Sequence, residues 1–243
     1  MKKAVFIGIL VLALAALQAG CDLPGEITGS GTIVTTQYDY SGFTTVAAAN
    51  ACRVTLTRAD NESITIRTDD NLAGYLVVVK NGSRLEIGLE PGYVYRDVTF
   101  EAEITMPDIY RLGLSGASCA DISGFDFEHE FRFDLSGASR VDGDMVLGLT
   151  RFYLSGASRI SLAEGWGGDL IISASGGSVL ELRELLSDNG EVVLSGGSSA
   201  TITVTGTLAY DLSGASQLYY YGDPVVGEAA LSGGSVARDM GAP

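Results

Sequence analysis

Serine is the reactive side chain that recurs most regularly in this sequence. The motif Ser-Gly-(Ala/Gly)-Ser occurs seven times, starting at Ser115, Ser136, Ser155, Ser175, Ser195, Ser213 and Ser232. A nucleophilic serine needs a base that accepts its proton and donors that stabilise an oxyanion. The single histidine, His129, lies between two glutamates, Lys80 is the only lysine after residue 20, and no Gly-x-Ser-x-Gly elbow is present. We therefore expect a protein that is not an enzyme.

Three acidic residues share a position relative to the motif. Asp121, Asp142 and Glu181 each lie six residues after a motif start, so stacked repeats would align them. Such a column offers hard oxygen ligands to Ca²⁺, or paired carboxylates for glycoside cleavage. The Gly-Gly-x-Gly-x-Asp pattern of calcium-binding repeats is missing, and acids beside turns are usually only solvated. We expect no metal and no cofactor, and keep these acids as the candidate calcium ligands.

An aromatic run lies near the end of the repeats. Tyr219, Tyr220 and Tyr221 could offer stacking faces to a glycan or a protein, because tyrosine combines apolar area with a hydroxyl group. Alternatively, these tyrosines cover the core of the last coils. The sequence leaves both interpretations open.

The N-terminus has the pattern of an export signal. Lys2 and Lys3 precede an uncharged apolar run, residues 4–17, which is shorter than a membrane-spanning helix. Small residues then lead to Cys21, as in a bacterial lipobox, in which the cysteine is lipidated and becomes the new N-terminus. The sequence predicts a signal peptide over 1–20 and a lipid anchor at Cys21 that tethers the protein to a membrane. An ordinary secretory signal that is cleaved elsewhere is the alternative.

Two further cysteines lie in the predicted mature chain. An exported protein can form a disulfide, so Cys52 and Cys119 are candidates for one. The alternative is that both are small buried apolar side chains.

The charge balance limits the class of partner. Residues 1–20 hold two of the 15 basic residues and none of the 30 acidic ones, so the chain from Cys21 has a net charge of about −17. Such a surface repels nucleic acids and anionic lipid headgroups, and a basic patch for phosphates is missing. We expect no nucleic-acid partner.

The spacing of the motif predicts the fold. Successive motifs start 21, 19, 20, 20, 18 and 19 residues apart, each beside apolar residues, and a constant period near 20 is typical of a solenoid. The segments between motifs are β-branched and rich in turn residues, which predicts an all-β fold, a parallel β-helix with coils of about 20 residues. Glycine is expected where stacked turns leave no room for a Cβ. The serine hydroxyls are expected to bond one another or the backbone along the stack.

The N-terminal half predicts less regular strands. Residues 53–57, 63–67, 84–87 and 99–106 alternate between apolar and polar side chains, and residues 69–80 could hold a helical turn. The short, Gly- and Pro-containing segment 22–31 is typical of a linker. We expect a lipid-anchored tether over 21–40 and one β-helical head domain over 41–240.

These segments, in this order, resemble the GIN domain, the head domain of bacterial auto-transporter adhesins, a family of unknown function. The resemblance covers about residues 40–238 and is carried by Phe43-Thr44-Thr45-Val46, Cys52-Arg53-Val54-Thr55-Leu56, Asp70-Asn71-Leu72, Leu85-Glu86-Ile87, Ile104-Thr105-Met106-Pro107 and the first Leu-Ser-Gly-Ala-Ser. It implies a β-helical protein that is exported and lipid-anchored or membrane-associated. The family has no catalytic residue set to transfer.

We therefore expect a lipid-anchored envelope or cell-surface protein that displays a rigid, acidic β-helix to a protein or glycan partner. A polysaccharide-active envelope enzyme is one alternative. A structural component that forms homo-oligomers through its strand-rich ends is another.

Overall fold

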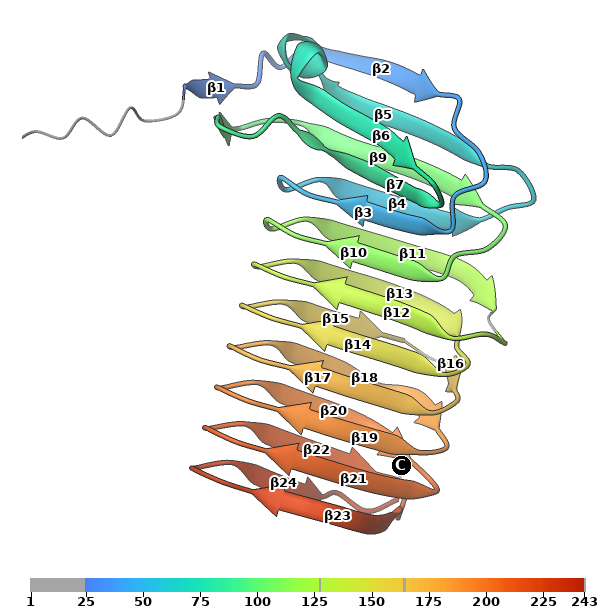
Figure 1. The fold of residues 1–243 in the computed structure, drawn as a ribbon, viewed down its shortest axis with the longest axis vertical. Helices are drawn as coiled ribbons and strands as arrows, with labels where there is room; N and C mark the ends of the chain where they lie inside the picture. The colour runs from blue at the N-terminus through green and yellow to red at the C-terminus, as the bar shows by residue number, and fades with distance from the viewer. Residues whose placement is uncertain (1–24, 127, 164, 243) are drawn as a thin grey trace, which may run out of the picture.

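The strands form a flattened solenoid. The structure, a computed structural model, describes residues 25–126, 128–163 and 165–242. Two large sheets pack face to face around an apolar core, and each coil of chain contributes one strand to each sheet (Figure 1). The parallel register pairs Arg111 with Arg132 and Arg132 with Arg151, so equivalent positions lie about 20 residues apart. This confirms the predicted parallel β-solenoid.

The sheet nearer the viewer in Figure 1 is called the front sheet here. Its spatial order is β23 (Val225–Leu231), β21 (Thr207–Leu212), β19 (Gly190–Leu194), β17 (Leu170–Ala174), β14 (Thr150–Leu154), β12 (Phe131–Leu135), β10 (Arg111–Leu114), β3 (Thr45–Ala48), β7 (Arg84–Leu89) and β6 (Leu76–Asn81). All neighbours are parallel except the β6–β7 pair.

The sheet behind it is the back sheet. Its order is β2 (Ile33–Tyr38), β5 (Ser63–Asp69), β9 (Phe100–Met106), β4 (Arg53–Arg58), β11 (Cys119–Asp126), β13 (Arg140–Val146), β15 (Arg159–Leu162), β18 (Val179–Ser187), β20 (Ser199–Val204), β22 (Gln217–Tyr221) and β24 (Val236–Asp239), with β16 (Gly165–Gly167) also on β18. A small third sheet joins β1 (Glu26–Thr28) to β8 (Val94–Arg96).

The core consists of columns of like side chains. Along each strand, successive side chains alternate between the core and solvent, so β12 and β14 each bury their first, third and fifth residues. Phe133 stacks on Phe152 of the next coil, with 5.2 Å between ring centroids. The apolar residue before each motif forms another column, in which Leu212 is 0 % exposed and Leu231, in the last coil, is 53 % exposed.

The Ser-Gly-(Ala/Gly)-Ser motif forms the turn between the two sheets. The second residue of each motif has a positive φ, +74° at Gly156 and +76° at Gly176. The Gly156 carbonyl accepts a hydrogen bond from the Gly177 N–H of the next coil at 2.7 Å. A Cβ on Gly176 would lie 2.4 Å from that carbonyl oxygen, so both the backbone conformation and the close stacking require glycine.

The last serine of the motif closes its own turn. The Ser158 hydroxyl donates to the Ser155 carbonyl at 2.8 Å, and the corresponding pair Ser178–Ser175 is 2.9 Å apart. The expectation that these hydroxyls bond along the stack was therefore wrong for most turns, because the carbonyl three residues earlier is nearer. Among the described turns, only the last one has serine hydroxyls that reach the previous coil, where Ser232 and Ser235 both donate to the Leu212 carbonyl.

An additional turn of the same kind lacks both serine and glycine. Asn50 and Ala51 adopt positive φ values of 63° and 58°, and the Ala51 N–H donates to the Gly116 carbonyl at 2.9 Å. Residues 49–52 thus stack on residues 115–118, on the side of the N-terminal end (Figure 1), with Cys52 at the position of Ser118. Asparagine tolerates the left-handed region better than most residues, which lets Asn50 replace glycine here.

The N-terminal end of the solenoid is closed by antiparallel strands. β2 pairs with β5 and β5 with β9, and the 3-10 helix η1 (Asp70–Tyr75) follows β5 within the segment predicted to hold a helical turn. The buried Asp69 carboxylate accepts hydrogen bonds from the Gly31 and Thr99 N–H groups, both at 2.7 Å. Residues 26–38 are thus not the tether expected over 21–40, because β1 pairs with β8, β2 pairs with β5, and every second residue of β2 is half-buried.

Adjacent glycines in one turn provide a test of this geometry. We expect Gly176→Ala to lower the free energy of unfolding by about 2 kcal/mol or more, because it adds left-handed strain to a backbone clash. Gly177→Ala is the matched control: its Cβ would lie 3.9 Å from the nearest carbonyl, and alanine already occupies this position at Ala157. Urea denaturation measures both, and equal stability of the two variants would contradict the turn geometry.

Candidate binding face

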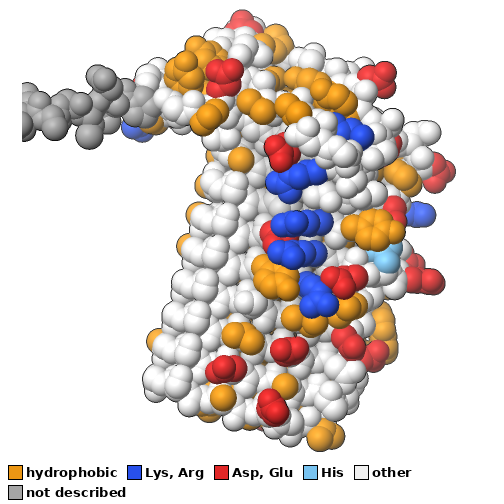
Figure 2. Space-filling view, in the orientation of Figure 1, with side chains coloured by type: hydrophobic (Ala, Val, Ile, Leu, Met, Phe, Trp, Pro, Cys, Tyr) orange, Lys and Arg blue, Asp and Glu red, His pale blue; other side chains and the backbone are white. Residues whose placement is uncertain are grey.

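Four arginines form a column on the solvent side of the front sheet. The register places Arg111, Arg132 and Arg151 on three successive strands, and Arg84 lies two strands from Arg111, with Thr45 between them. Figure 2 shows them as a blue stripe across the upper half of this face. We call these four residues the arginine ladder. Parallel strands are about 4.8 Å apart, so unpaired guanidinium groups at this spacing would repel one another.

Carboxylates between the arginines compensate this repulsion. Asp134 accepts from Arg111 Nε at 2.6 Å and from Arg132 Nη2 at 2.6 Å. Arg84 Nε pairs with Glu86 at 2.6 Å, and Arg151 Nε pairs with Glu130 at 2.7 Å. The four arginines therefore face three carboxylates, which leaves a surplus of positive charge on a chain whose formal net charge is −15.

Arg132 is the most firmly held member of the ladder. Hydrogen bonds to Asp134 raise the pKa of its guanidinium group, and the Asp134 charge adds to this effect. Its guanidinium carbon also lies 4.3 Å from the centroid of the Tyr153 ring, which is a cation–π contact. Hydrogen bonds to Glu130 likewise raise the pKa of Arg151. Arg132 and Arg151 are thus cationic at all physiological pH values.

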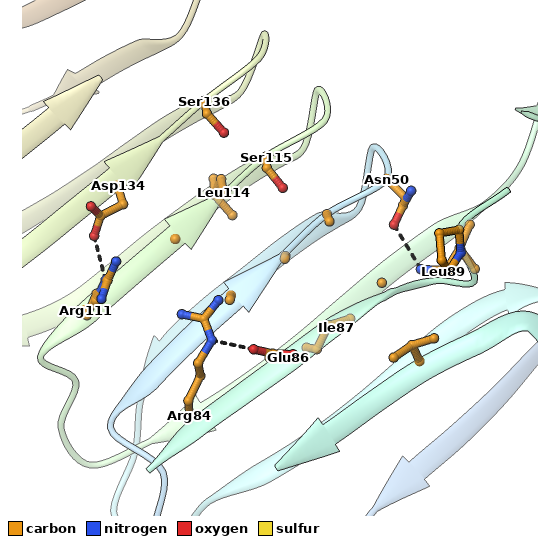
Figure 3. A pocket seen from close by; sticks show the side chains of 17 residues that line it. Asn50, Arg84, Glu86, Ile87, Leu89, Arg111, Leu114, Ser115, Asp134 and Ser136 are labelled. Carbon is orange, nitrogen blue, oxygen red and sulfur yellow. Dashed lines mark hydrogen bonds and ion pairs between the residues drawn. The ribbon is translucent and has the colours of Figure 1, made fainter. Parts of the chain in front are cut away.

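A hollow of about 400 Å³ opens at the upper end of the ladder. The floor crosses β7, β3 and β10, where the exposed positions hold small residues, Ala47 and Gly113. Figure 3 shows Arg84 and Arg111 toward the start of these strands, and Ser115 and Asn50 at their far end. The remaining lining residues are Ala48, Ala49, Val77, Glu86, Ile87, Gly88, Leu89, Pro91, Leu114, Asp134 and Ser136. This volume lies in the range of ligand pockets. The sequence did not predict the hollow, because its residues come from β7 and β10, which lie on either side of β3 and are brought together only by the strand order of the sheet.

The structure brings the predicted acidic residues into one column. Asp121 pairs with Asp142, and the column continues through Ser161 to Glu181 on the solvent side of the back sheet. Arg140 forms an ion pair with Asp142, and Arg159 Nη2 contacts Glu181 at 2.5 Å. Within the described ranges, no group of three or more His, Cys, Asp and Glu side chains could hold a metal ion. These three acids therefore stay untested candidates for calcium, without structural support.

The three adjacent tyrosines divide between core and surface. Tyr220 faces the core and is 9 % exposed, so the idea that it stacks on a ligand is wrong, because alternate residues of β22 point inward. Tyr219 and Tyr221 face solvent. The Tyr219 hydroxyl donates to Gln217 at 2.7 Å, and the Arg183 guanidinium lies 4.5 Å from the Tyr221 ring centroid. These two rings therefore remain candidates for stacking.

Cys52 and Cys119 are both free thiols in the structure. Cys119 lies opposite Arg53 and faces outward, whereas Cys52 precedes Arg53 and faces the core. The two side chains therefore lie on opposite sides of the back sheet, and the structure does not support the candidate disulfide. Burial, with smaller contributions from Cys119 and Glu101, raises the pKa of the Cys52 thiol.

The single histidine is packed against its neighbours. The His129 ring stacks on Tyr110 with 3.9 Å between centroids, and its Nε2 lies 2.8 Å from an Asp108 carboxylate oxygen. These contacts suit a structural role in the loop before β12.

The predicted lipidation site, Cys21, lies outside the described residues. None of the described helices is both long and apolar enough to cross a membrane.

The cysteine geometry predicts two rates of thiol modification. In the chain that begins after Cys21, we expect a thiol reagent to modify Cys119 rapidly and Cys52 only as the protein unfolds, because burial keeps Cys52 protonated and inaccessible. Cys119→Ser should remove the fast phase. Cys52→Ser should leave the fold intact, because Ser118 fills the equivalent position in the next coil. Thiols that react only after reduction would instead demonstrate a disulfide.

Comparisons with known proteins agree with this architecture. A Bacteroides fragilis protein whose structure is described as a putative adhesin aligns with a TM-score of 0.76 at 17% identity, over 88% of this chain and 99% of its own. A putative lipid binding protein from Parabacteroides distasonis gives 0.72 at 14% identity, over 88% and 99%. A putative adhesin from Parabacteroides merdae gives 0.67 at 16% identity, over 89% and 99%. At these identities the similarity establishes the fold alone.

No curated protein matches the sequence. Residues 42–224 match the family described as "Putative auto-transporter adhesin, head GIN domain". The match covers most of the chain, from β3 to β22, and leaves out β1, β2 and the last coil. The chain therefore belongs to the GIN domain family.

Proposed function

We propose that this protein is an exported, lipid-anchored protein of the cell envelope that displays a rigid solenoid and binds a protein or glycan partner without catalysis. The arginine ladder is the observation that carries the proposal. Guanidinium groups are the preferred cations at binding interfaces, since their planar fork forms directed hydrogen bonds and stacks on aromatic rings. Their alignment on one exposed face places four guanidinium groups beside three carboxylates.

The solenoid suits display because its coils are joined by continuous backbone hydrogen bonds. From Gly137 onward, each turn bonds the next through its glycine carbonyl, and every buried side-chain polar atom in the described ranges has a partner. The fold therefore keeps the ladder side chains at fixed spacing. The family description and two of the similar structures name adhesins, which supports the same role.

The acidic column of the back sheet does not favour the alternative of polysaccharide cleavage. A glycosidase needs one carboxyl group that protonates the leaving group and a second carboxylate that attacks or activates water. Asp142 and Glu181 are held by Arg140 and Arg159. Carboxylates bound to arginine in this way are not available to deliver a proton.

Anchoring is proposed from the sequence of the N-terminal segment. We expect Cys21→Ala to abolish incorporation of a labelled fatty acid and to release the protein from the membrane fraction, because the acyl chains supply the membrane affinity. Cys119→Ala is the matched control and should keep the label. Retention of the label by the Cys21 variant would contradict lipidation at this residue.

Adhesion should depend on the front face. We expect cells that display Arg132→Gln/Arg151→Gln to adhere at least several-fold less to a surface that retains wild-type cells, because the exposed guanidinium donors are lost. Arg140→Gln/Arg159→Gln is the matched control, since it removes two arginines from ion pairs on the back sheet. Surface staining confirms equal display. Equal adhesion by both double variants would exclude the front face as the contact.

A further inference from the structure

The hollow at the upper end of the ladder has the chemistry of a binding site for an acidic sugar. We propose that it binds one saccharide ring that carries a carboxylate. This inference rests on the proposed function, because it names the ligand class that one part of the front face recognises. Its evidence is separate and comes from the hydrogen-bond donors of Arg84 and Arg111, the small residues of the floor, and the polar groups at the far end.

Arg84 and Arg111 keep donors available for a ligand. Each contacts its carboxylate through Nε alone, Glu86 for Arg84 and Asp134 for Arg111. Within the described residues, the Nη groups of both arginines form no hydrogen bond, in contrast to Arg132, which uses Nε and Nη2 on Asp134. A guanidinium group with free Nη donors binds a carboxylate through paired, charge-assisted hydrogen bonds.

The floor between the two arginines is flat. Thr45 takes the ladder position on β3, and Ala47 and Gly113 occupy the next exposed positions on β3 and β10. A sugar ring could therefore rest on the sheet between the arginines. Val77, Leu89 and Pro91 supply apolar lining, which suits the C–H groups of a ring.

The far end of the hollow offers polar partners for hydroxyl groups. Ser115 and Ser136 begin their motif turns and are half-buried, and no hydrogen bond of their hydroxyl groups is present in the described ranges. Asn50 uses its Oδ1 to accept from the Leu89 N–H at 3.1 Å, which leaves its amide N–H groups available. Glu86 and Asp134 can accept hydrogen bonds from sugar hydroxyls as well.

The charge of the molecule favours a single acidic ring over a long polyanion. Arg84, Arg111, Glu86 and Asp134 line the hollow, so its positive and negative charges are equal in number. Asp134 also pairs with Arg132, which leaves a small surplus of positive charge. The formal net charge of −15 repels a polymer with many negative charges at long range. A ligand with a single carboxylate, bound between Arg84 and Arg111, is repelled less than such a polymer because it carries only one negative charge.

The test is a titration of the chain that begins at residue 22 with sugars that differ only in charge. Glucuronate, galacturonate and N-acetylneuraminate are the acidic probes, glucose and galactose are the neutral controls, and acetate represents the carboxylate alone. We expect saturable shifts of the Ala47 and Gly113 amide signals in NMR spectra, with at least tenfold tighter binding of one acidic sugar than of its neutral control or acetate. Absence of saturable binding for all three acidic sugars would overturn the proposal.

Two kinds of variant locate the site. Arg84→Gln and Arg111→Gln should each weaken binding of the acidic sugar at least tenfold, and Arg159→Gln on the back sheet is the control. Gly113→Leu should fill the hollow without strain, because its Cβ would lie 3.8 Å from the nearest atom. Ser173→Leu, in the same column three coils further along the stack of the front sheet, is the control for added bulk. Thermal denaturation verifies that each variant is folded.

The outcomes separate this proposal from the proposed function. Binding that persists in Gly113→Leu, or that is equal for charged and neutral sugars, would overturn the assignment of the hollow. Loss of adhesion in the front-face double variant with normal sugar binding would support the display function and leave the hollow as a separate contact. Normal adhesion with sugar binding that requires Arg84 would support the hollow and contradict the ladder as the adhesive surface.

Discussion

The turn between the two sheets is the constraint on which the rest of this structure depends. Each Ser-Gly-(Ala/Gly)-Ser segment places a left-handed residue directly above another, and the carbonyl of one accepts from the next coil at 2.6–2.7 Å in the regular turns. The distance is short because no Cβ separates the two glycines. From Gly156 onward, a Cβ at this position would lie 2.4–2.6 Å from the carbonyl oxygen of the preceding coil, so a side chain would push the coils apart.

In-phase turns convert a sequence period into columns of side chains. Inside, the columns are leucine and phenylalanine, which pack between the two sheets. On the solvent side of each sheet, the same register places like charges on neighbouring strands. This is unfavourable unless opposite charges lie between them. Asp134 between Arg111 and Arg132 provides this compensation on the front sheet, and Arg140 beside Asp142 provides it on the back sheet. The paired charges hold exposed side chains in defined orientations, which a recognition surface requires.

The accuracy of the sequence-based predictions varied with the regularity of the chain. The column of Asp121, Asp142 and Glu181 was predicted correctly, because its members share one phase relative to the motif. The turn at Asn50 was missed, because residues 49–52 contain neither the serines nor the glycine of the motif. The arginine ladder could have been found by aligning the residues before each motif, where Arg111, Arg132 and Arg151 share a phase. Arg84 could not have been found in this way, because it lies on β7, which no motif follows and which pairs with the far side of β3 from β10.

The sequence by itself determined the all-β solenoid, its coil length, the glycine turns and the alternation of core and surface, since each of these follows from local periodicity. The tertiary structure decided which strands close the N-terminal end, that Tyr220 faces inward while Tyr219 does not, and that Cys52 and Cys119 lie on opposite sides of one sheet. It also decided that β3 lies between β7 and β10. That order brings Arg84, Ala47 and Arg111 around one hollow, and it depends on pairing between segments distant in sequence, which no local pattern encodes.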